Sequence, residues 1–384
     1  MKLIDLTQAQ ALRASIDLTP IDGAGGRIFP PTYPGPVGAK EKEPRHVVEE
    51  LPSGERRVLI DSVASQANRQ EAALVAARSE SLIDFADVYL DLSGTEAGIA
   101  RLSATEMPHR LSDAILRDSE IDGLPFARSA LGQRLLATKP GDLTSILETS
   151  PTTLLYGCWF SQHGSSQRLK IQRCTTSEIW ADNAVLGQAV GSRIDPLGIE
   201  KVDLYEARDG DWTALAEKAV KVGDKPKPLG KKPSELNHGN IAPSIRQQGI
   251  TAERVQLCWA MPLAAVRRLR FGGGARDAAG QAYVVALGLL ARVLDHQAGY
   301  SLRSRCDLLS SGPMAVDIVG PDGEIATHTV TTDMAIALFR EAEEGLERAG
   351  IAVRGVIEAK PGTKLVDLIH ANRLRQELGK ETAE

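Results

Sequence analysis

The sequence predicts an α + β protein in which helices cover one face of a ferredoxin-like sheet. Its early order is strand, hairpin, helix, strand, and its later order is strand, helix, strand, as in two βαβ halves separated by insertions. The length of 384 residues exceeds the usual size of one domain, so a second domain or large insertions are expected. Apolar residues make up 42% and charged residues 25%, which allows a sizeable core.

The individual elements follow from hydrophobic periodicity and from turn residues. Alternation predicts a strand at 11–19, and a Pro-Ser-Gly turn predicts a hairpin leading into a helix after Asp61. Apolar runs predict strands at 152–162 and 253–263, a buried helix at 280–299 and a strand at 311–324. We therefore expect one domain over 1–384, with a palm at about 10–80, 151–175 and 251–325, a helical insertion at about 81–150, a basic loop insertion at about 176–250, and C-terminal helices at 332–379.

Charge is distributed unevenly along the chain. The formal net charge is -5, but the stretch from Lys218 to Arg270 holds eleven Lys and Arg against three acidic residues. A basic segment on an acidic body indicates one surface that faces a polyanion. Residues 218–235 are rich in Lys, Pro and Gly, and we expect them to be mobile without a ligand. Aromatic residues make up only 4%, which argues against a surface built mainly on stacked rings.

The helix that follows the hairpin opens with polar side chains. At 100° per residue, four of them share one stripe, and free amide groups at a helix start favour phosphate. A capped helix with a solvated face is the alternative, with Asp61 or Ser62 as the cap. The residues predicted to bind nucleic acid here are Ser62, Ser65, Gln66, Asn68 and Arg69.

A glycine-rich loop and a basic approach to it form the second candidate site. Three consecutive glycines before a helix let backbone amides approach an anion closely. The P-loop pattern is absent, and a plain flexible turn is the alternative. An extended segment would place Arg268 and Arg270 on one face, and 167–175 is a basic alternating strand. The predicted contacts are Arg168, Lys170, Arg173, Arg267, Arg268, Arg270, Gly272, Gly273 and Gly274.

A third candidate is the loop that holds Asn237, His238 and Asn240 around Gly239. A histidine needs a positioned partner for acid–base catalysis, and no sequence neighbour supplies one. A loop of polar turn-forming residues is the preferred interpretation, and RNA contact is the second.

Signatures of metal sites and of nucleophilic catalysis are missing. The seven histidines show no H-E-x-x-H spacing, and no G-x-S-x-G occurs. We expect no catalytic residue, no metal ligand and no cofactor. The four scattered cysteines predict buried, reduced thiols in a cytoplasmic protein. We expect neither a signal peptide nor a membrane span.

Three stretches carry a resemblance to a known family: "VLIDSVASQANRQE" (58–71), "SELNHGNIAPS" (234–244) and "RRLRFGGG" (267–274). They resemble hallmark stretches of the backbone protein of type I-G (formerly I-U) CRISPR interference complexes. That family belongs to the repeat-associated mysterious protein (RAMP) superfamily. The resemblance extends from the loop at 25–35 to the strand at 302–308, which is most of the chain.

The resemblance implies an RNA-recognition-motif-like palm with thumb- and finger-like insertions, and a scaffold rather than an enzyme. Copies of the chain would polymerise as a helical filament along CRISPR RNA and present it for pairing with target DNA. The implied partners are the other Cascade subunits, namely a large subunit and a guide-end-capping or processing subunit, and a recruited helicase-nuclease, with no membrane. Ser65, Gln66 and Arg69 match a superfamily pattern that contacts the RNA backbone, and Gly272, Gly273 and Gly274 match its glycine-rich loop.

Two alternatives remain open on the sequence. One is a metal-independent RAMP endoribonuclease that processes CRISPR transcripts with a histidine such as His46 or His238. The other, from a different class, is a phosphometabolite-binding enzyme that uses the loop around Gly273.

Overall fold

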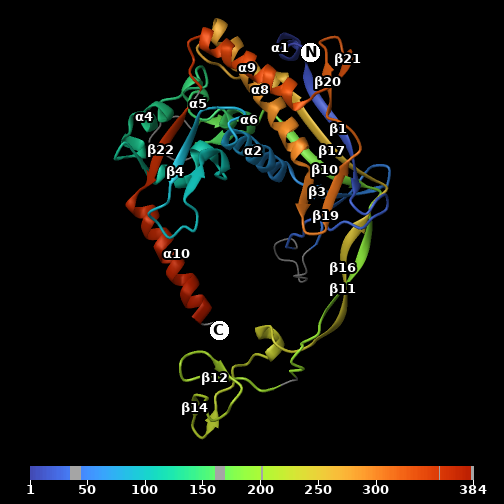
Figure 1. Cartoon of the computed structure of the whole chain (residues 1–384), viewed down its shortest axis with the longest axis vertical. Coiled ribbons are helices and arrows are strands. Elements are labelled where there is room, and N and C mark those ends of the chain that lie inside the picture. The colour runs from blue at the N-terminus through green and yellow to red at the C-terminus, as the bar shows by residue number, and fades with distance from the viewer. Residues whose placement is uncertain (35–44, 161–168, 200–201, 354, 382–384) are drawn as a thin grey trace. The chain divides into compact units, whose positions relative to one another are not determined.

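The computed structural model describes residues 1–34, 45–160, 169–199, 202–353 and 355–381, shown in Figure 1. The chain divides into two compact units, where a single domain was expected. Unit 1 comprises Met1–Gly94, Gly98–Val185 and Ile250–Leu365. Unit 2 comprises Thr95–Ala97, Leu186–Gly249 and Val366–Glu384.

The larger sheet of unit 1 has the spatial order β18-β19-β1-β17-β10-β3-β2, and β20 pairs with β1 and with β21. Its strands come from the beginning, the middle and the later part of the chain, which gives it the mixture of colours seen in Figure 1. Their bounds are β1 (Ala11–Pro20), β2 (Val48–Glu50), β3 (Arg56–Asp61), β10 (Thr176–Asp182), β17 (Arg254–Pro262), β18 (Tyr300–Arg303), β19 (Cys306–Ser310), β20 (Ala315–Val319) and β21 (Ile325–Thr329).

The centre of this sheet is antiparallel. β1 pairs with β17 from Ala11↔Pro262 to Leu18↔Val255, β17 pairs with β10, and β10 pairs with β3. The chain passes from β1 through helix α2 (Val63–Ser79) to β10, and from β17 through helix α8 (Gly274–Ala298) to β19. The α + β class is thus confirmed. The ferredoxin-like plan stays a prediction, and this path through the order β19-β1-β17-β10 favours it.

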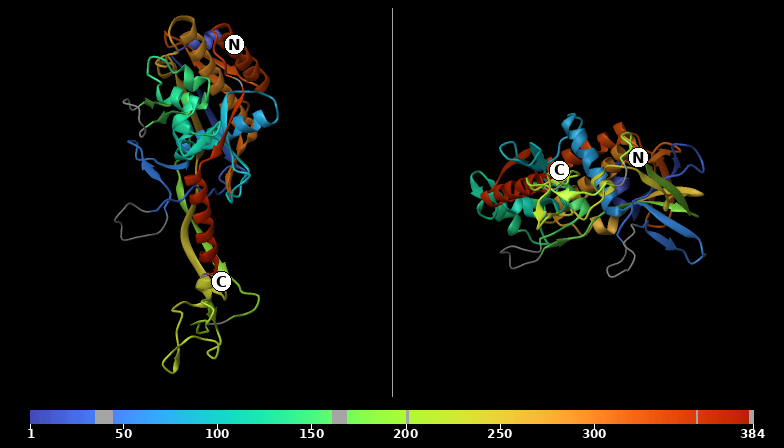
Figure 2. Two further views of the ribbon diagram at one scale, coloured as in Figure 1. Left: turned by 90° about the vertical axis from the view of Figure 1, so that its left-hand side faces the viewer. Right: turned by 90° about the horizontal axis from the view of Figure 1, so that it is seen from below.

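The core lies between this sheet and its helices. Strand β1 alternates as predicted, with Leu12 and Ile16 buried and Arg13 and Asp17 exposed, so only one of its faces is apolar. Helix α9 (Thr332–Arg348) packs beside α8 (Figure 1 and Figure 2). Among the described residues, α8 is the one helix long and apolar enough to cross a membrane. However, 78% of its most apolar 18-residue segment is buried inside the protein. Burial of that extent is typical of a core helix.

A second sheet of unit 1 corrects the expected helical insertion at 81–150. Its order is β5-β4-β22-β6-β7, with β4 and β22 parallel. The sequence prediction missed it because short strands of two to six residues carry little periodicity. The strands are β4 (Asp87–Asp91), β5 (Arg101–Ser103), β6 (Ser119–Ile121), β7 (Leu124–Pro125) and β22 (Val356–Pro361), among the short helices η1 (Ala104–Glu106), η2 (Arg110–Ser112), α3 (Ala114–Arg117), η3 (Phe126–Arg128), α4 (Ala130–Leu136) and α5 (Thr144–Leu147).

The expected palm strands at 152–162 and 167–175 are also corrected. The apolar run starts as helix α6 (Thr152–Tyr156), which Gly157 ends at φ 82°. A short pair follows, β8 (Cys158–Trp159) with β9 (Lys170–Ile171), and it forms a separate sheet. The palm strand is β10 instead, so the insertion begins after 182 rather than at 176. Apolar runs of this length do not distinguish a buried helix from a buried strand.

Unit 2 contains a long strand pair and small hairpins. The basic stretch 218–235, which we expected to be mobile, includes the hairpin of β14 and β15 and the short helix η4, although most of its side chains are exposed. The predicted C-terminal helices are α9 and α10, and β22 lies between them. The elements that lie mostly or wholly in unit 2 are β11 (Val185–Arg193), β12 (Tyr205–Glu206), β13 (Trp212–Thr213), β14 (Lys221–Val222), β15 (Lys225–Pro226), η4 (Pro233–Leu236), β16 (Ile241–Thr251), which pairs with β11, and α10 (Thr363–Glu381).

Candidate nucleic-acid interface

The start of α2 is a capped helix end. The Ser62 hydroxyl oxygen accepts a hydrogen bond from the Ser65 amide at 3.3 Å, which stabilises the first turn. Ser62 and Ser65 are half-buried, whereas Asn68 is exposed. The capping alternative therefore describes Ser62, and Asn68 is the predicted contact of this helix that reaches furthest into solvent.

Gln66 is fully buried and cannot meet a ligand at the surface. Its Nε2 donates to Asp61 Oδ2 at 2.8 Å, and its Oε1 accepts from Ser177 Oγ at 3.0 Å and from Arg292 Nη1 at 3.1 Å. The predicted RNA contact is wrong for Gln66, because these partners use its amide to join β3, β10, α2 and α8. The sequence pattern placed it on a polar stripe, and the packing of α8 against α2 covers Gln66 within that stripe.

Arg69 is also bound within the protein. Its Nε lies 3.0 Å from Asp61 Oδ2, and its Nη2 donates to the Leu302 carbonyl oxygen at 2.7 Å. The buried Asp61 carboxylate is shared with Arg303, whose Nη2 lies 2.8 Å from Oδ1. The Arg69 side chain remains 28% exposed, so an edge of this cluster faces solvent, but its guanidinium group primarily holds β18 against α2.

The glycine-rich loop holds a carboxylate of its own. Gly272, Gly273 and Gly274 all have positive φ (90°, 94° and 54°), which only glycine adopts readily. Asp277, in the first turn of α8, accepts hydrogen bonds from the Phe271 and Gly273 amides at 2.5 Å and 3.0 Å. The sequence predicted that the amides of this loop bind phosphate. The prediction is wrong for the Phe271 and Gly273 amides, because both donate to Asp277.

Asp277 is stabilised in its charged form by this arrangement. Burial alone would raise the pKa of its carboxyl group. The hydrogen bonds from the Phe271 amide, the Arg270 guanidinium and the Gly273 amide outweigh burial and lower the pKa below its usual value. An anion at the start of α8 is thus favoured, and the protein itself supplies one.

The arginines before the loop lie on a turn, not on an extended segment. Helix α7 (Leu263–Val266) ends at Arg267, which donates to the Thr7 and Ala9 carbonyl oxygens. Arg268 Nη1 donates to Gln172 Oε1 at 3.2 Å, and Arg270 Nη1 lies 3.0 Å from Asp277 Oδ2. All three side chains are exposed. The predicted extended segment is wrong, because these arginines lie on a turn, yet the turn keeps these cations at the surface.

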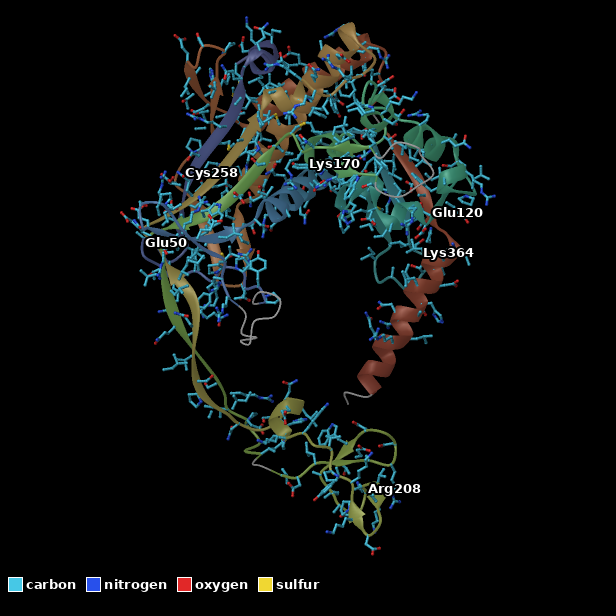
Figure 3. All side chains as sticks on the ribbon, turned by 180° about the vertical axis from the view of Figure 1, so that it is seen from behind. Glu50, Glu120, Lys170, Arg208, Cys258 and Lys364 are labelled. Carbon is cyan, nitrogen blue, oxygen red and sulfur yellow. The ribbon has the colours of Figure 1, made fainter. Side chains whose placement is uncertain are left out.

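An apolar groove, with a volume of about 320 Å³, lies beside this turn. Lys170, Gln172 and Arg268 are its polar lining residues, and Lys170 is labelled in Figure 3. The Leu143 amide donates to the Arg270 carbonyl oxygen at 2.7 Å, which links the groove to the glycine-rich loop. The structure thus brings together the predicted residues Lys170, Arg268 and Arg270. The apolar lining consists of Pro140, Leu143, Leu169, Ile171, Ala265 and Leu269.

The groove and the start of α2 are separate places on unit 1. Gln66 contacts Arg292 near the end of α8, whereas the glycine-rich loop precedes Gly274 at the beginning of the same helix. Eighteen residues of helix separate Gly274 from Arg292, which is about 27 Å along its axis. The two predicted phosphate sites therefore do not form one site. Of the other predicted residues, Arg173 is exposed next to the groove residue Gln172, and Arg168 lies outside the described residues.

The loop with Asn237, His238 and Asn240 belongs to unit 2 and is organised around Asp195. The Asp195 carboxylate accepts from the Gly239 amide at 3.1 Å, and Asn240 Oδ1 accepts from the Asp195 amide at 2.7 Å. Asn237 has left-handed backbone angles (φ 62°, ψ 25°), and the His238 ring lies 5.7 Å from Trp212. This geometry fits the preferred interpretation, a turn built by polar residues.

Perturbed carboxyl groups occur away from the groove. Burial raises the pKa of Glu71 to about 7, although Arg110 donates to both of its carboxylate oxygens at 2.5 Å and 2.7 Å. Burial likewise raises the pKa of Asp87 to about 6, against hydrogen bonds from Ser103 and Val88. Such shifts mark catalytic sites as well as structural ion pairs. Neither residue lines the groove.

The metal-ligating residue types do not gather into a site. Among the residues that the structure describes, no three His, Cys, Asp or Glu could hold a metal ion. The expectation of buried thiols holds for Cys174 and Cys306. It is wrong for Cys258, which is exposed on the large sheet because it alternates with the buried Trp259 (Figure 3).

Three residues of this interface were missed in the sequence. Asp277 caps the glycine-rich loop, Arg303 shares Asp61, and Trp159 is exposed opposite Lys170 on the pair β8–β9. Asp277 had a signal in sequence, because an acidic residue in the first turn of a helix stabilises its start. Trp159 lies in an apolar run that predicted burial, so the sequence carried no signal of its exposure.

Part of the sequence matches a known protein family. Residues 12–185 match the family described as "CRISPR-associated protein GSU0053 (Cas_GSU0053)". The resemblance to CRISPR-associated proteins is confirmed. The matched segment is somewhat less than half of the chain and includes β8, β9 and α2. The type I-G subtype stays a prediction.

Comparisons with solved structures and with curated proteins do not bear on the function of this chain. A chain from a solved structure entitled "CRISPR RNA-guided surveillance complex, pre-nicking" is similar at 14% identity and a TM-score of 0.32, over 94% of this chain and 99% of that chain. A similarity at that score supports no inference about this chain. No curated protein matches the sequence.

Proposed function

We propose that the chain is the CRISPR RNA-binding backbone subunit of a type I-G Cascade interference complex. In this role it polymerises along the guide RNA and presents the guide for pairing with target DNA. The observation that carries the proposal is the match of residues 12–185 to a CRISPR-associated family. In this proposal the partners of the chain are the other Cascade subunits and the helicase-nuclease. The chain itself is a scaffold without catalysis.

The cations around the groove support RNA as the ligand. Lys170 and Arg268 line it, and Arg267 is exposed on the adjoining turn, whereas Arg270 is paired with Asp277. Clustered cations bind phosphate without reading sequence, which a guide-holding protein requires because the guide bases must stay free to pair.

The exposed face of the large sheet is a poorer candidate for RNA. Its arginines lie against carboxylates: Arg13 with Asp317 at 3.1 Å, Arg254 with Asp17 at 2.7 Å, and Arg57 with Glu49 at 2.6 Å. A phosphate would have to displace each carboxylate. We therefore assign RNA binding to the groove side of unit 1.

Sedimentation of the purified chain with RNAs of increasing length tests the proposal. A scaffold with one basic surface must line up several copies on a long RNA through head-to-tail contacts, which form open filaments. We expect the mass of the complex to rise with RNA length, ribonuclease to shorten the oligomers, and nucleic acid extracted from the purified protein to be RNA. A monomer or dimer that stays discrete on saturating long RNA contradicts the proposal.

The same preparation separates the two alternatives. RNA cleavage by the chain in a metal chelator identifies the endoribonuclease. Saturable binding of a phosphorylated metabolite without any RNA binding identifies the phosphometabolite enzyme.

A further inference from the structure

Trp159 is an exposed aromatic ring in a chain with few aromatic residues. Its relative exposure is 55%, and it lies on β8 directly opposite Lys170 of β9. The Lys170 ammonium nitrogen lies 5.7 Å from the centre of the ring, within the range of a cation–π contact. Large aromatic side chains are usually mostly buried, so an indole ring held open beside a cation indicates a binding surface.

Lys170 connects this ring to the apolar groove. Its ammonium group lies near the ring, and the same residue is one of those that line the groove. The groove volume of about 320 Å³ lies at the lower end of the range for small-molecule sites, roughly 300–1,000 Å³. Its apolar lining suits a flat, weakly polar group of limited size, and its basic rim suits an anionic chain attached to that group.

A single-stranded nucleic acid has both features. Its unstacked bases stack on exposed aromatic rings, and its phosphates bind lysine and arginine. The groove residue Arg268 donates a hydrogen bond to Gln172 Oε1 at 3.2 Å, so a second cation is held at the groove besides Lys170.

We propose that Trp159 and the groove form a two-nucleotide site for single-stranded RNA. One base stacks on the Trp159 ring, the next base enters the groove, and Lys170 binds the phosphate between them while Arg268 binds the phosphate that follows. The choice of RNA over DNA rests on the proposed function, whereas the contacts to base and phosphate rest on the geometry. The site holds two bases on each copy and thereby sets the position of the protein along the strand. The bases between the sites of successive copies stay free to pair with target DNA.

Short oligonucleotides of about eight nucleotides test this site without filament formation. Binding to the full chain is measured for an intact RNA and for an RNA of the same length whose central nucleotides lack bases, with a DNA of the same sequence as a third ligand. We expect Trp159→Ala to weaken binding of the intact RNA by about tenfold or more and to leave the abasic RNA unchanged. Trp159→Phe should retain most of the binding.

A variant on the groove tests the second base. Ala265→Leu adds apolar volume to the lining of the groove. We expect this variant to bind the intact RNA more weakly and the abasic RNA unchanged. Lys170→Ala should weaken both RNAs alike and reduce the log–log salt dependence of binding by about one unit. The control is Trp180→Ala on β10, where a tryptophan also contacts an arginine, Arg57 at 4.3 Å, but on the open face of the sheet. This control should bind as the unmodified chain does.

The outcomes separate this site from the proposed function. If Trp159→Ala and Ala265→Leu bind intact RNA as tightly as the unmodified chain, the two-nucleotide site is wrong and RNA binding stands. If the unmodified chain binds neither RNA, the proposed function fails as well. If the chain binds the DNA more tightly than the RNA, the proposed contacts to bases stand, but the proposal that RNA is the ligand is wrong. A thermal melt of each variant shows that it is folded.

Discussion

The side chain of Gln66 links its own helix α2 to β3, β10 and α8, and removing its hydrogen bonds tests whether its role is structural. If Gln66 is changed to Ala, Asp61, Ser177 and Arg292 each lose a buried partner. Leaving buried polar groups unsatisfied costs about 1–3 kcal/mol. We expect the free energy of unfolding, measured in urea, to fall by about that amount.

Asn68→Ala is the matched control for this change. Asn68 lies on the same helix and is exposed, so its loss should alter stability by less than about 0.5 kcal/mol. A Gln66→Ala protein of unaltered stability and reduced RNA binding would return Gln66 to the RNA interface.

Residues of this kind mark a limit of sequence analysis. The 3.6-residue period correctly grouped Gln66 with Ser62 and Arg69 on one stripe, and it correctly placed Leu74 in the core. It could not show that Asp61, Arg292 and Arg303 would meet the polar stripe, because two of these come from more than two hundred residues away. A buried polar network and a surface patch have the same local pattern.

At the scale of elements, strands β1 and β17 and helix α8 agree with the sequence. They are long, and their periodicity is unbroken. The helix α6 was predicted as a strand because five apolar or β-branched residues suit either state, and only the packing of α6 against α8 decides. The small sheet was missed for another reason: its central pair, β4 with β22, joins residues 87–90 to 356–359.

The strand β4 carries a second prediction. Burial raises the pKa of Asp87 in the folded chain to about 6, above the usual 3.8. A raised carboxyl pKa means that the folded state holds its proton up to a higher pH than the unfolded state does. Stability from this group is therefore fully present below about pH 4 and is lost as pH rises through about 6, by at most about 3 kcal/mol.

Asp87→Asn removes this titration and keeps a side-chain Oδ1 that can accept the hydrogen bond from the Val88 amide. We expect the variant to be more stable than the unmodified chain at pH 7 and closer to it at pH 4, in chemical denaturation at both values. An equal stability difference at both pH values would show that folding does not change the pKa of Asp87, so that the nearby Arg78 and the hydrogen bonds offset the effect of burial.

Charge and composition along the chain predicted a distinct basic segment but not its boundaries. The stretch 218–235 was identified by its Lys, Pro and Gly content, and it falls within unit 2. The beginning of that unit at Leu186 was missed, because β10 and β11 are consecutive strands with no change in composition between them. Division into units depends on contacts between distant residues, which composition does not report.

The basic stretch of unit 2 carries the last prediction. Its lysines at 218, 221, 225, 231 and 232 are exposed, and few of its residues are buried. Such a segment opens readily and is open to trypsin. If it lies along the RNA in the assembled filament, phosphate contacts cover these lysines and order the hairpin of β14 and β15. We expect RNA to slow cleavage within 218–235 severalfold, measured by mass spectrometry of the fragments. An unfolded substrate in the same reaction controls for inhibition of trypsin by RNA, and equal cleavage rates with and without RNA would show that the segment is only a tether.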